Sequence, residues 1–318
     1  MSRILSIIIP IYNEEKCICA LWERLRLLEQ RMEEYSIEFI MVNDGSSDRS
    51  LSMLKEIAGH NGNVKLISFS RNFGHQIAIS AGIEHAQGEA VAIMDADLQD
   101  PPELIFEMLN KYQEGHDIVY AVRRERRGET FIKKKSAECF YRTVNRLSSI
   151  PIPRNTGDFR LMSRRAVDSL NLMKEKDRFV RGMISWIGFK QTGIEFDRDP
   201  RVAGETKYPL RKMLKFAFDG ILSFSNVPLR LATWLGFATS VFAVFYIFIV
   251  LIKKFMGYTL PGYASIMVSI LFLGGVQLIT IGILGEYIGR IYNEAKARPL
   301  YIIEETLNFN EKAKTALK

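Results

Sequence analysis

Short apolar runs alternate with longer amphipathic stretches over the first two-thirds of the chain. The apolar runs predict β-strands, which we place at residues 5–11, 38–42, 64–69, 90–94 and 117–121, with a further strand at 157–163 that leads into a helix. Apolar residues spaced three and four positions apart predict helices at residues 14–34, 48–58, 75–86 and 102–113. Alternation of this kind predicts βαβ crossovers, and therefore an α/β, Rossmann-like fold with a mostly parallel sheet.

The last third of the chain carries two long apolar runs. Residues 231–252 and 263–285 contain no charged side chain, and each is long enough to cross the hydrocarbon core of a bilayer. Residues 253–262 form the turn between them. Residues 209–227 place apolar side chains at helical spacing among lysines and arginines, which predicts an amphipathic helix on the membrane surface. Packing of this helix on the N-terminal domain is the alternative.

The distribution of basic residues predicts the orientation of these spans. Lysine and arginine favour the cytoplasmic side. The turn holds only Lys253 and Lys254, whereas the flanking segments hold Arg211, Lys212, Lys215, Arg230, Arg290, Lys296 and Arg298. We therefore expect a multi-pass protein of the inner (cytoplasmic) membrane, with the large domain and the C-terminus in the cytoplasm. Glycines such as Gly285 and Gly289 allow close helix contact and make a homo-oligomer possible.

The net charge narrows the class of partners. Lysine and arginine number 43 against 36 acidic residues, which gives +7 over 318 residues. A basic balance favours nucleic acid, anionic lipid or phosphate compounds. The sequence contains no nucleic-acid-binding module, so we expect no nucleic acid partner and favour lipid and phosphate. The three cysteines lack the spacing of a zinc site and are expected to be reduced.

Acidic residues directly follow the predicted strand at 90–94. Asp95, Asp97 and Gln99 alternate along an extended segment, so their side chains can point into one cleft. Hard oxygen ligands of this kind suit Mg²⁺ or Mn²⁺ bound together with a diphosphate. A solvated acidic turn is the alternative.

Two more polar clusters follow predicted strands. Tyr12-Asn-Glu14 follows the first strand, and Asn43-Asp-Gly-Ser46 follows the second. Ligands of open α/β sheets bind beyond the carboxyl ends of the strands. We therefore expect these clusters to meet the acidic residues in one cleft.

The motifs together resemble a known family. Pro10-x-Tyr-Asn-Glu14, Asn43-Asp-Gly-Ser-Ser-Asp48, Arg71-Asn-Phe-Gly74 and Asp95-x-Asp-x-Gln99 occur in the order typical of inverting GT-A glycosyltransferases of family 2. With Gly157-Asp-Phe-Arg160 and two C-terminal spans, the chain resembles the polyprenyl-phosphate glycosyltransferases. The segment 274–292 is similar to their bactoprenol glucosyltransferase branch. The Q-x-x-R-W box of processive synthases is missing, which favours a single transfer per encounter.

The resemblance implies a division of the chain. The expected parts are a GT-A glycosyltransferase domain at 1–206, an amphipathic juxtamembrane segment at 207–228, transmembrane helices at 229–253 and 263–287, and a cytoplasmic tail at 288–318. It also implies transfer of a hexose, expected to be glucose, from UDP-glucose to undecaprenyl phosphate, which supplies lipid-linked sugar for a surface glycan. The alternatives are another donor, such as GDP-mannose or a modified amino-arabinose, and a silent scaffold that binds sugar nucleotide.

The resemblance also implies roles for individual residues on the donor side. The expected nucleotide-binding residues are Pro10, Tyr12, Glu14, Asp44 and Arg71, with Asp44 on the base. Core packing is the alternative for Tyr12, and a surface ion pair is the alternative for Arg71. Asp97 and Gln99 are the expected metal ligands. Asp95 is expected to contact the metal, the ribose or the sugar, and it is expected to be catalytic together with Asp158.

On the acceptor side the resemblance places a catalytic carboxylate at Asp158. This residue could act as a weak base, as an orienting group or as the holder of Arg160; a structural salt bridge with Arg160 is the alternative. The expected ligands of the acceptor phosphate are basic and hydroxyl side chains: Arg123, Lys134, Ser136, Arg160, Arg201 and Lys207. General attraction to anionic lipid is the alternative for these cations.

Overall fold

A computed structural model describes residues 3–124, 153, 156–197, 227–257 and 262–309 of the chain. The strands are β1 (Arg3–Ile11), β2 (Tyr35–Asn43), β3 (Val64–Phe69), β4 (Ala90–Ile93), β5 (Ile118–Arg123), β6 (Thr156–Ser163), β7 (Gln191–Phe196) and β8 (Ile303–Leu307). The helices are α1 (Ile18–Gln30), α2 (Ser50–His60), α3 (His75–His85), α4 (Leu104–Gln113), α6 (Arg164–Leu172), α7 (Val180–Ile187), α9 (Val227–Phe255) and α10 (Tyr263–Ala295).

All eight strands form one sheet in the order β7-β5-β6-β4-β1-β2-β3-β8. β1 pairs in parallel with β2 and β4, and β2 pairs in parallel with β3. Among the described strands, β6 runs antiparallel to both of its neighbours, β4 and β5, and β8 runs antiparallel to β3. The chain places β2 and β3 on one side of β1 and β4 on the other, so the strand order reverses between β1 and β4. Crevices at such a reversal are where open α/β sheets bind ligands.

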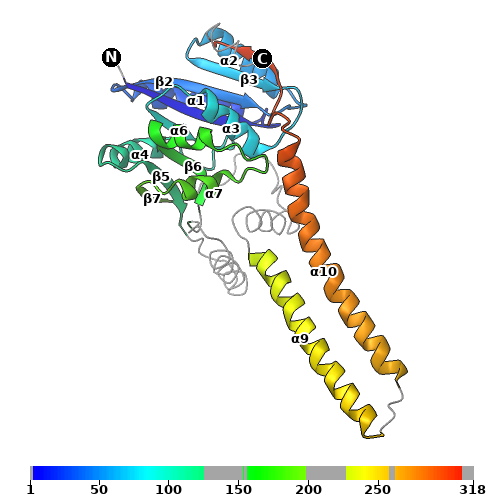
Figure 1. Cartoon of the computed structure of the whole chain (residues 1–318). Coiled ribbons are helices and arrows are strands. Elements are labelled where there is room, and N and C mark those ends of the chain that lie inside the picture. The colour runs from blue at the N-terminus through cyan, green and yellow to red at the C-terminus, as the bar shows by residue number, and fades with distance from the viewer. Residues whose placement is uncertain (1–2, 125–152, 154–155, 198–226, 258–261, 310–318) are drawn as a thin grey trace.

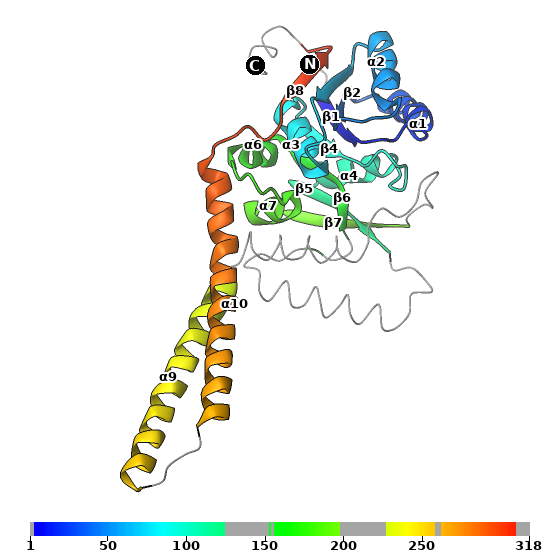
Figure 2. The same cartoon turned by 90° about the vertical axis from the view of Figure 1, so that its right-hand side faces the viewer.

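The sheet is buried on both faces, which explains the continuous apolar runs in its strands. In β1, every residue from Leu5 to Ile11 is buried. One core cluster combines alternate strand residues with apolar side chains of α1, α2 and α4, and the other combines the opposite strand faces with α3, α6 and α7. The resulting three layers lie one behind the other in Figure 1 and side by side in Figure 2, with the sheet in the middle.

The eighth strand comes from the C-terminal tail, which the sequence pattern did not predict. β8 pairs antiparallel with β3, at the edge of the sheet farthest from β7. Residues 303–307 therefore complete the sheet of the N-terminal domain, and the expected domain boundary at residue 206 leaves this strand out. Figures 1 and 2 show how the chain returns from α10 to the sheet.

α9 and α10 extend away from the sheet as a hairpin of two long helices (Figure 2). Both are long and apolar enough to cross a membrane, and neither apolar window is buried inside the protein. α10 continues past the predicted end of the span, and Glu286 and Arg290 lie 3.9 Å apart on it, as their spacing of four residues predicts. The predicted amphipathic helix at 209–227 lies almost wholly outside the described residues.

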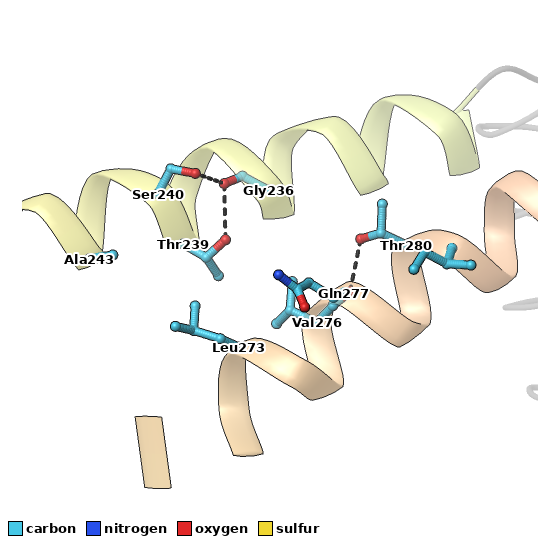
Figure 3. Close-up of a pocket in the computed structure, with 9 residues that line it drawn as sticks. Gly236, Thr239, Ser240, Ala243, Leu273, Val276, Gln277 and Thr280 are labelled. Carbon is cyan, nitrogen blue, oxygen red and sulfur yellow. Dashed lines mark hydrogen bonds between the residues drawn. The ribbon is translucent and has the colours of Figure 1, made fainter. Parts of the chain in front are cut away.

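A cavity of about 480 Å³ lies between α9 and α10. Figure 3 shows Gln277 between the two helices, with Thr239 and Thr280 beside it. Both threonine hydroxyls donate to carbonyls of their own helices, namely those of Gly236 and Val276. Each hydroxyl therefore has its hydrogen-bond acceptor within its own helix. None of the residues that line this cavity is among the predicted site residues.

Candidate active site

Hydrogen bonds join the loops that follow β1 and β2. The backbone NH of Asn13 donates to Oγ of Ser46 (3.0 Å), and the NH of Ser47 donates to Oδ1 of Asn13 (2.8 Å). Asn13 has a positive φ of 55°, a conformation that asparagine tolerates better than most residues. The two polar clusters predicted at these strand ends therefore do meet.

The loop after β2 also packs closely against the loop after β3. Gly45 has a φ of 63°, and a Cβ atom there would lie 2.3 Å from the carbonyl carbon of Arg71. Only glycine permits this approach without a shift of the backbone. The two loops thus form one continuous surface at the carboxyl ends of β2 and β3.

Asp44 fixes the loop at residues 72–74 rather than facing solvent. Its side chain is buried, and its oxygens accept from Nδ2 of Asn72 (3.0 Å), the NH of Phe73 (2.7 Å) and the NH of Gly74 (3.0 Å). Burial raises the pKa of Asp44, although these backbone NH groups oppose the rise. The contact with a nucleotide base expected for Asp44 stays a prediction; the structure gives this residue the task of shaping the loop.

The other expected nucleotide-binding residues surround the same loops. Pro10 is buried at the end of β1, whereas Tyr12 is 43% exposed and available to stack on a base. The NH of Glu14 donates to Oγ of Ser50 (3.0 Å). Arg71 stacks over the ring of Phe73, with its guanidinium carbon 4.2 Å from the ring centroid. These positions agree with a nucleotide site but do not test the contacts.

The acidic segment after β4 turns sharply at Leu98, which has a positive φ of 58° and a buried side chain. A left-handed leucine is a strained conformation of the kind that gathers at functional sites. The turn brings the NH of Gln99 to Oδ1 of Asp97 (3.1 Å), so these two expected metal ligands are adjacent.

Asp95 is a carboxylate with two other carboxylates, Asp97 and Asp158, nearby. Its Oδ1 atom is buried and accepts no hydrogen bond within the part of the chain that the structure describes. Burial raises the pKa of Asp95, and the charges of Asp158 and Asp97 raise it further, against the opposing effect of His75.

A divalent cation fits this arrangement. Over the described residues, no group of three or more His, Cys, Asp or Glu side chains gathers as a metal site. Mg²⁺ and Mn²⁺ do not need one, since a typical site combines one or two carboxylates with the phosphates of the substrate. Asp95, Asp97 and the Gln99 amide offer that donor set, and a cation would offset the charge at Asp95.

Asp158 on β6 lies beside Asp95 but is paired with cations. Nε and Nη2 of Arg181 donate to its two oxygens at 2.7 and 3.1 Å, and Nε2 of His75 lies 3.2 Å from Oδ2. Burial would raise the pKa of Asp158, but the charge of Arg181 and the hydrogen bond to His75 hold it well below its usual range. His75 also reaches Oδ1 of Asp95, at 3.5 Å.

Arg160 is buried and bound to the backbone of its own strand. It is 5% exposed, and its guanidinium donates to the backbone oxygens of Gly157 (2.9 Å) and Asp158 (3.2 Å). The carboxylate of Asp158 lies 4.0 Å from it and is bound more closely by Arg181. These bonds use two of the five N–H groups of the guanidinium, so Arg160 supports β6, and its expected contact with the acceptor phosphate stays a prediction.

Of the five other residues expected to bind the acceptor phosphate, only Arg123 lies within the described part of the chain. Arg123 ends β5, with Nη2 3.7 Å from Oδ2 of the buried Asp100. The other four, Lys134, Ser136, Arg201 and Lys207, lie outside the described residues.

Three polar residues join the site that the sequence did not single out as site residues. His75, Gln76 and Arg181 all contact Asp158. His75 and Gln76 directly follow the Arg71–Gly74 motif, so position in the chain could have indicated them. Arg181 follows no motif and reaches the site only because α7 packs near β6 and α3.

Comparison with known proteins agrees with this site. Residues 6–170 match Glycosyl transferase family 2, and residues 227–291 match the GtrB C-terminal hairpin. The chain is 52% identical over 309 residues to the uncharacterized glycosyltransferase YkcC of Bacillus subtilis (strain 168), covering 96% of this chain and 95% of that protein. It is 43% identical over 311 residues to the bactoprenol glucosyl transferase of Shigella phage SfV, covering 98% and 99% of the two chains.

Among solved structures, glucosyl-3-phosphoglycerate synthase from Mycobacterium tuberculosis covers 69% of this chain and 78% of its own at 18% identity and a TM-score of 0.47. That likeness concerns the fold alone. The family match spans more than half of the chain and coincides with the loops described above. The chain therefore belongs to glycosyl transferase family 2, and it is a glycosyltransferase with a GT-A domain and a C-terminal hairpin of the GtrB type.

Proposed function

We propose that this enzyme transfers a glucosyl residue, with inversion, from UDP-glucose to undecaprenyl phosphate at the cytoplasmic face of the membrane. The observation that carries the proposal is the contact of Asp95 with His75, which directly follows the loop that Asp44 holds, in a chain that also has two apolar helices. The relative from Shigella phage SfV is named a bactoprenol glucosyl transferase, and its similarity extends over both parts.

The donor is proposed to bind across the strand reversal. Tyr12 stacks on the uracil, and the loops held by Asp44 and Gly45 line the nucleoside pocket. Asp97 and Gln99 would hold Mg²⁺ or Mn²⁺, with Asp95 on the metal or on the sugar. The metal, when bound, offsets the charge that develops on the departing UDP.

The acceptor needs little activation. Its phosphate is a monoester with a second pKa of about 6, so its oxygen is ionised near neutral pH. That oxygen forms the new bond to the anomeric carbon while the bond from this carbon to the UDP oxygen breaks with its electron pair. Arg123, Lys134, Ser136, Arg201 and Lys207 are proposed to hold the acceptor phosphate, since guanidinium groups grip phosphate in pairs of hydrogen bonds. The product is lipid-linked glucose for modification of a surface glycan.

A transfer assay tests the proposal. Purified protein in detergent receives undecaprenyl phosphate, Mg²⁺ or Mn²⁺, and in turn radiolabelled UDP-glucose, UDP-N-acetylglucosamine and GDP-mannose. We expect label from UDP-glucose in the lipid fraction, and none after the metal is removed with a chelator. Asp97→Ala should lower the rate by about 100-fold or more, as the loss of one charge-stabilising group typically does.

The matched control is Asp168→Ala, which removes a mostly exposed carboxylate on α6 and should leave the rate unchanged. Label from another donor alone would replace glucose in the proposal and keep the chemistry. Tight UDP binding without lipid label from any donor would instead favour a scaffold that binds sugar nucleotide.

A further inference from the structure

The carboxylate of Asp158 is surrounded by hydrogen-bond donors. Its side chain is 7% exposed. Arg181 contributes two donors, Nε at 2.7 Å and Nη2 at 3.1 Å, while Nε2 of His75 lies at 3.2 Å and Nε2 of Gln76 at 3.4 Å. Oδ1 of Asp158 accepts from Nε of Arg181, while Nη2 of Arg181, His75 and Gln76 all face Oδ2. Both oxygens of Asp158 are therefore held by neighbouring side chains.

This environment makes Asp158 a fixed anion rather than a base. The pKa of Asp158 lies well below its usual range, because the charge of Arg181 and the hydrogen bond to His75 outweigh the effect of burial. A phosphate acceptor is already ionised and needs no strong base. The remaining task for Asp158 is to orient its neighbours.

The neighbours of Asp158 connect three elements of the fold. Gln76, in the first turn of α3, donates to Asp158 and accepts from the NH of Val180, the first residue of α7 (3.0 Å). Arg181 is the next residue of α7 and grips Asp158 on β6 with both arms of its guanidinium. His75 begins α3 and lies between Asp158 and Oδ1 of Asp95. A change at Arg181 would therefore move Asp158, and Asp158 would in turn move the His75 ring that lies against Asp95.

We propose that Arg181 is a positioning residue, which fixes Asp158 so that Asp158 holds the His75 ring against Asp95. This inference rests on the proposed function, since it assigns the His75–Asp95 contact to the sugar-nucleotide site. A two-armed grip sets the angle of the carboxylate as well as its position, which a lysine cannot do.

Kinetics of Arg181 variants test the role. Arg181→Ala should lower kcat by about 100-fold, because a shift of about 1 Å in a reacting group costs that much. The KM for UDP-glucose should change little, since the carboxylate that Arg181 binds lies on β6 and not in the nucleotide loops. Arg181→Lys keeps the charge and loses the fork, so its kcat should fall by about tenfold. Millimolar guanidinium should restore part of the rate to Arg181→Ala and none to Asp158→Ala.

Arg178→Ala is the matched control. Arg178 lies three residues earlier and donates to the backbone oxygens of Glu175 and Met173. Its loss therefore disturbs the segment that leads into α7 but removes no hydrogen bond to Asp158. Equal kcat values for the two alanine variants, or a parallel loss of UDP affinity and melting temperature in Arg181→Ala, would show that Arg181 is merely structural and overturn the proposal.

A spectroscopic readout separates this inference from the proposed function. The chain has four histidines, so the His75 ring can be assigned by isotope labelling and a His75→Gln variant. Arg181→Ala should shift the ring nitrogen resonances of His75, and Arg178→Ala should not. This result does not depend on sugar transfer, so wild-type protein that transfers no glucose would refute the proposed function alone. An unshifted His75 ring in Arg181→Ala would refute the positioning role, whatever the activity.

Discussion

Glu38 is a buried charge at the opposite end of the sheet from the site, and its interactions concern stability. It is 7% exposed on β2 and accepts from Oγ of Ser6, from Nζ of Lys65 (2.5 Å) and from the NH of Gln87 (2.6 Å). Burial would raise the pKa of Glu38, but the hydrogen bonds from Lys65, Ser6 and Gln87 lower it below the ordinary value of 4.5.

Replacing Glu38 with Gln should therefore destabilise the protein in a pH-dependent way. A carboxylate whose pKa is lowered by folding contributes stability above its unfolded pKa and loses it as the pH falls through its folded pKa. We expect a loss of about 3 kcal/mol in the free energy of unfolding at neutral pH, because Lys65 is left with an unpaired charge. Melting curves of the wild type and the variant should converge below pH 4.5, the ordinary pKa value of this group.

The control for this prediction is Glu114→Gln. Glu114 pairs with Lys111 at 2.9 Å on the surface, so its replacement should give no measurable change. A gap between Glu38→Gln and the wild type that stays constant from neutral to acidic pH would contradict the ionised state assigned to Glu38.

Single residues also mark the limit of prediction from sequence. Asp95, Asp97 and Gln99 could be predicted to meet because they alternate directly after an apolar strand, and that relation is local. Arg181 could not, because its contact with Asp158 depends on where α7 packs, 23 residues further along the chain. The grip of Asp44 on residues 72–74 likewise depends on two loops meeting in space.

At the scale of elements, the sequence pattern did not predict α7, β7 or β8. Of these, β8 comes from the far end of the chain. The strand contains Glu304 and Glu305, so its apolar pattern is weak, and its partner β3 lies more than 200 residues away. Its contacts are nevertheless specific. Tyr301 stacks on Phe69 with ring centroids 4.9 Å apart, and Nδ2 of Asn308 donates to the backbone oxygens of Ala58 (2.8 Å) and Val64 (2.7 Å). The tail therefore closes an edge of the sheet that would otherwise be open.

Removing residues 300–318 should destabilise the catalytic domain. The deletion exposes the unpaired edge of β3, which invites aggregation. It also removes the Tyr301 stack and the Asn308 bonds, so we expect the melting temperature to fall by about 5 °C or more, for a loss on the order of 2 kcal/mol. Differential scanning fluorimetry and size-exclusion chromatography in detergent measure both effects.

A shorter deletion provides the control for the tail. Removing residues 310–318 keeps β8 and Phe309, and should lower the melting temperature much less than the longer deletion does. Equal melting temperatures for the wild type and the longer deletion would show that β8 contributes nothing to the stability of the sheet.

At the scale of the whole molecule, the sheet constrains how the chain can cross a membrane. β1 to β7 precede α9, whereas β8 follows α10, and all belong to one sheet. A sheet cannot be divided by a bilayer, so the chain must return to the side from which it started. Two spans satisfy this condition, and one span does not. The pairing of β3 with β8 thus supports, independently of the lysine and arginine pattern, a hairpin with both ends on the same side.

Cysteine labelling tests this topology. Met256 lies at the end of the hairpin near the turn and is 66% exposed, and Leu172 at the end of α6 is 79% exposed. In right-side-out membrane vesicles, a membrane-impermeant maleimide should label Met256→Cys directly. It should label Leu172→Cys only after permeabilisation, because the catalytic domain is expected on the cytoplasmic side. The wild-type chain controls for its own cysteines, of which Cys19 is exposed and on the catalytic domain. Labelling of Leu172→Cys in intact vesicles would place the sheet outside, while protection of Met256→Cys would mean that the hairpin does not cross.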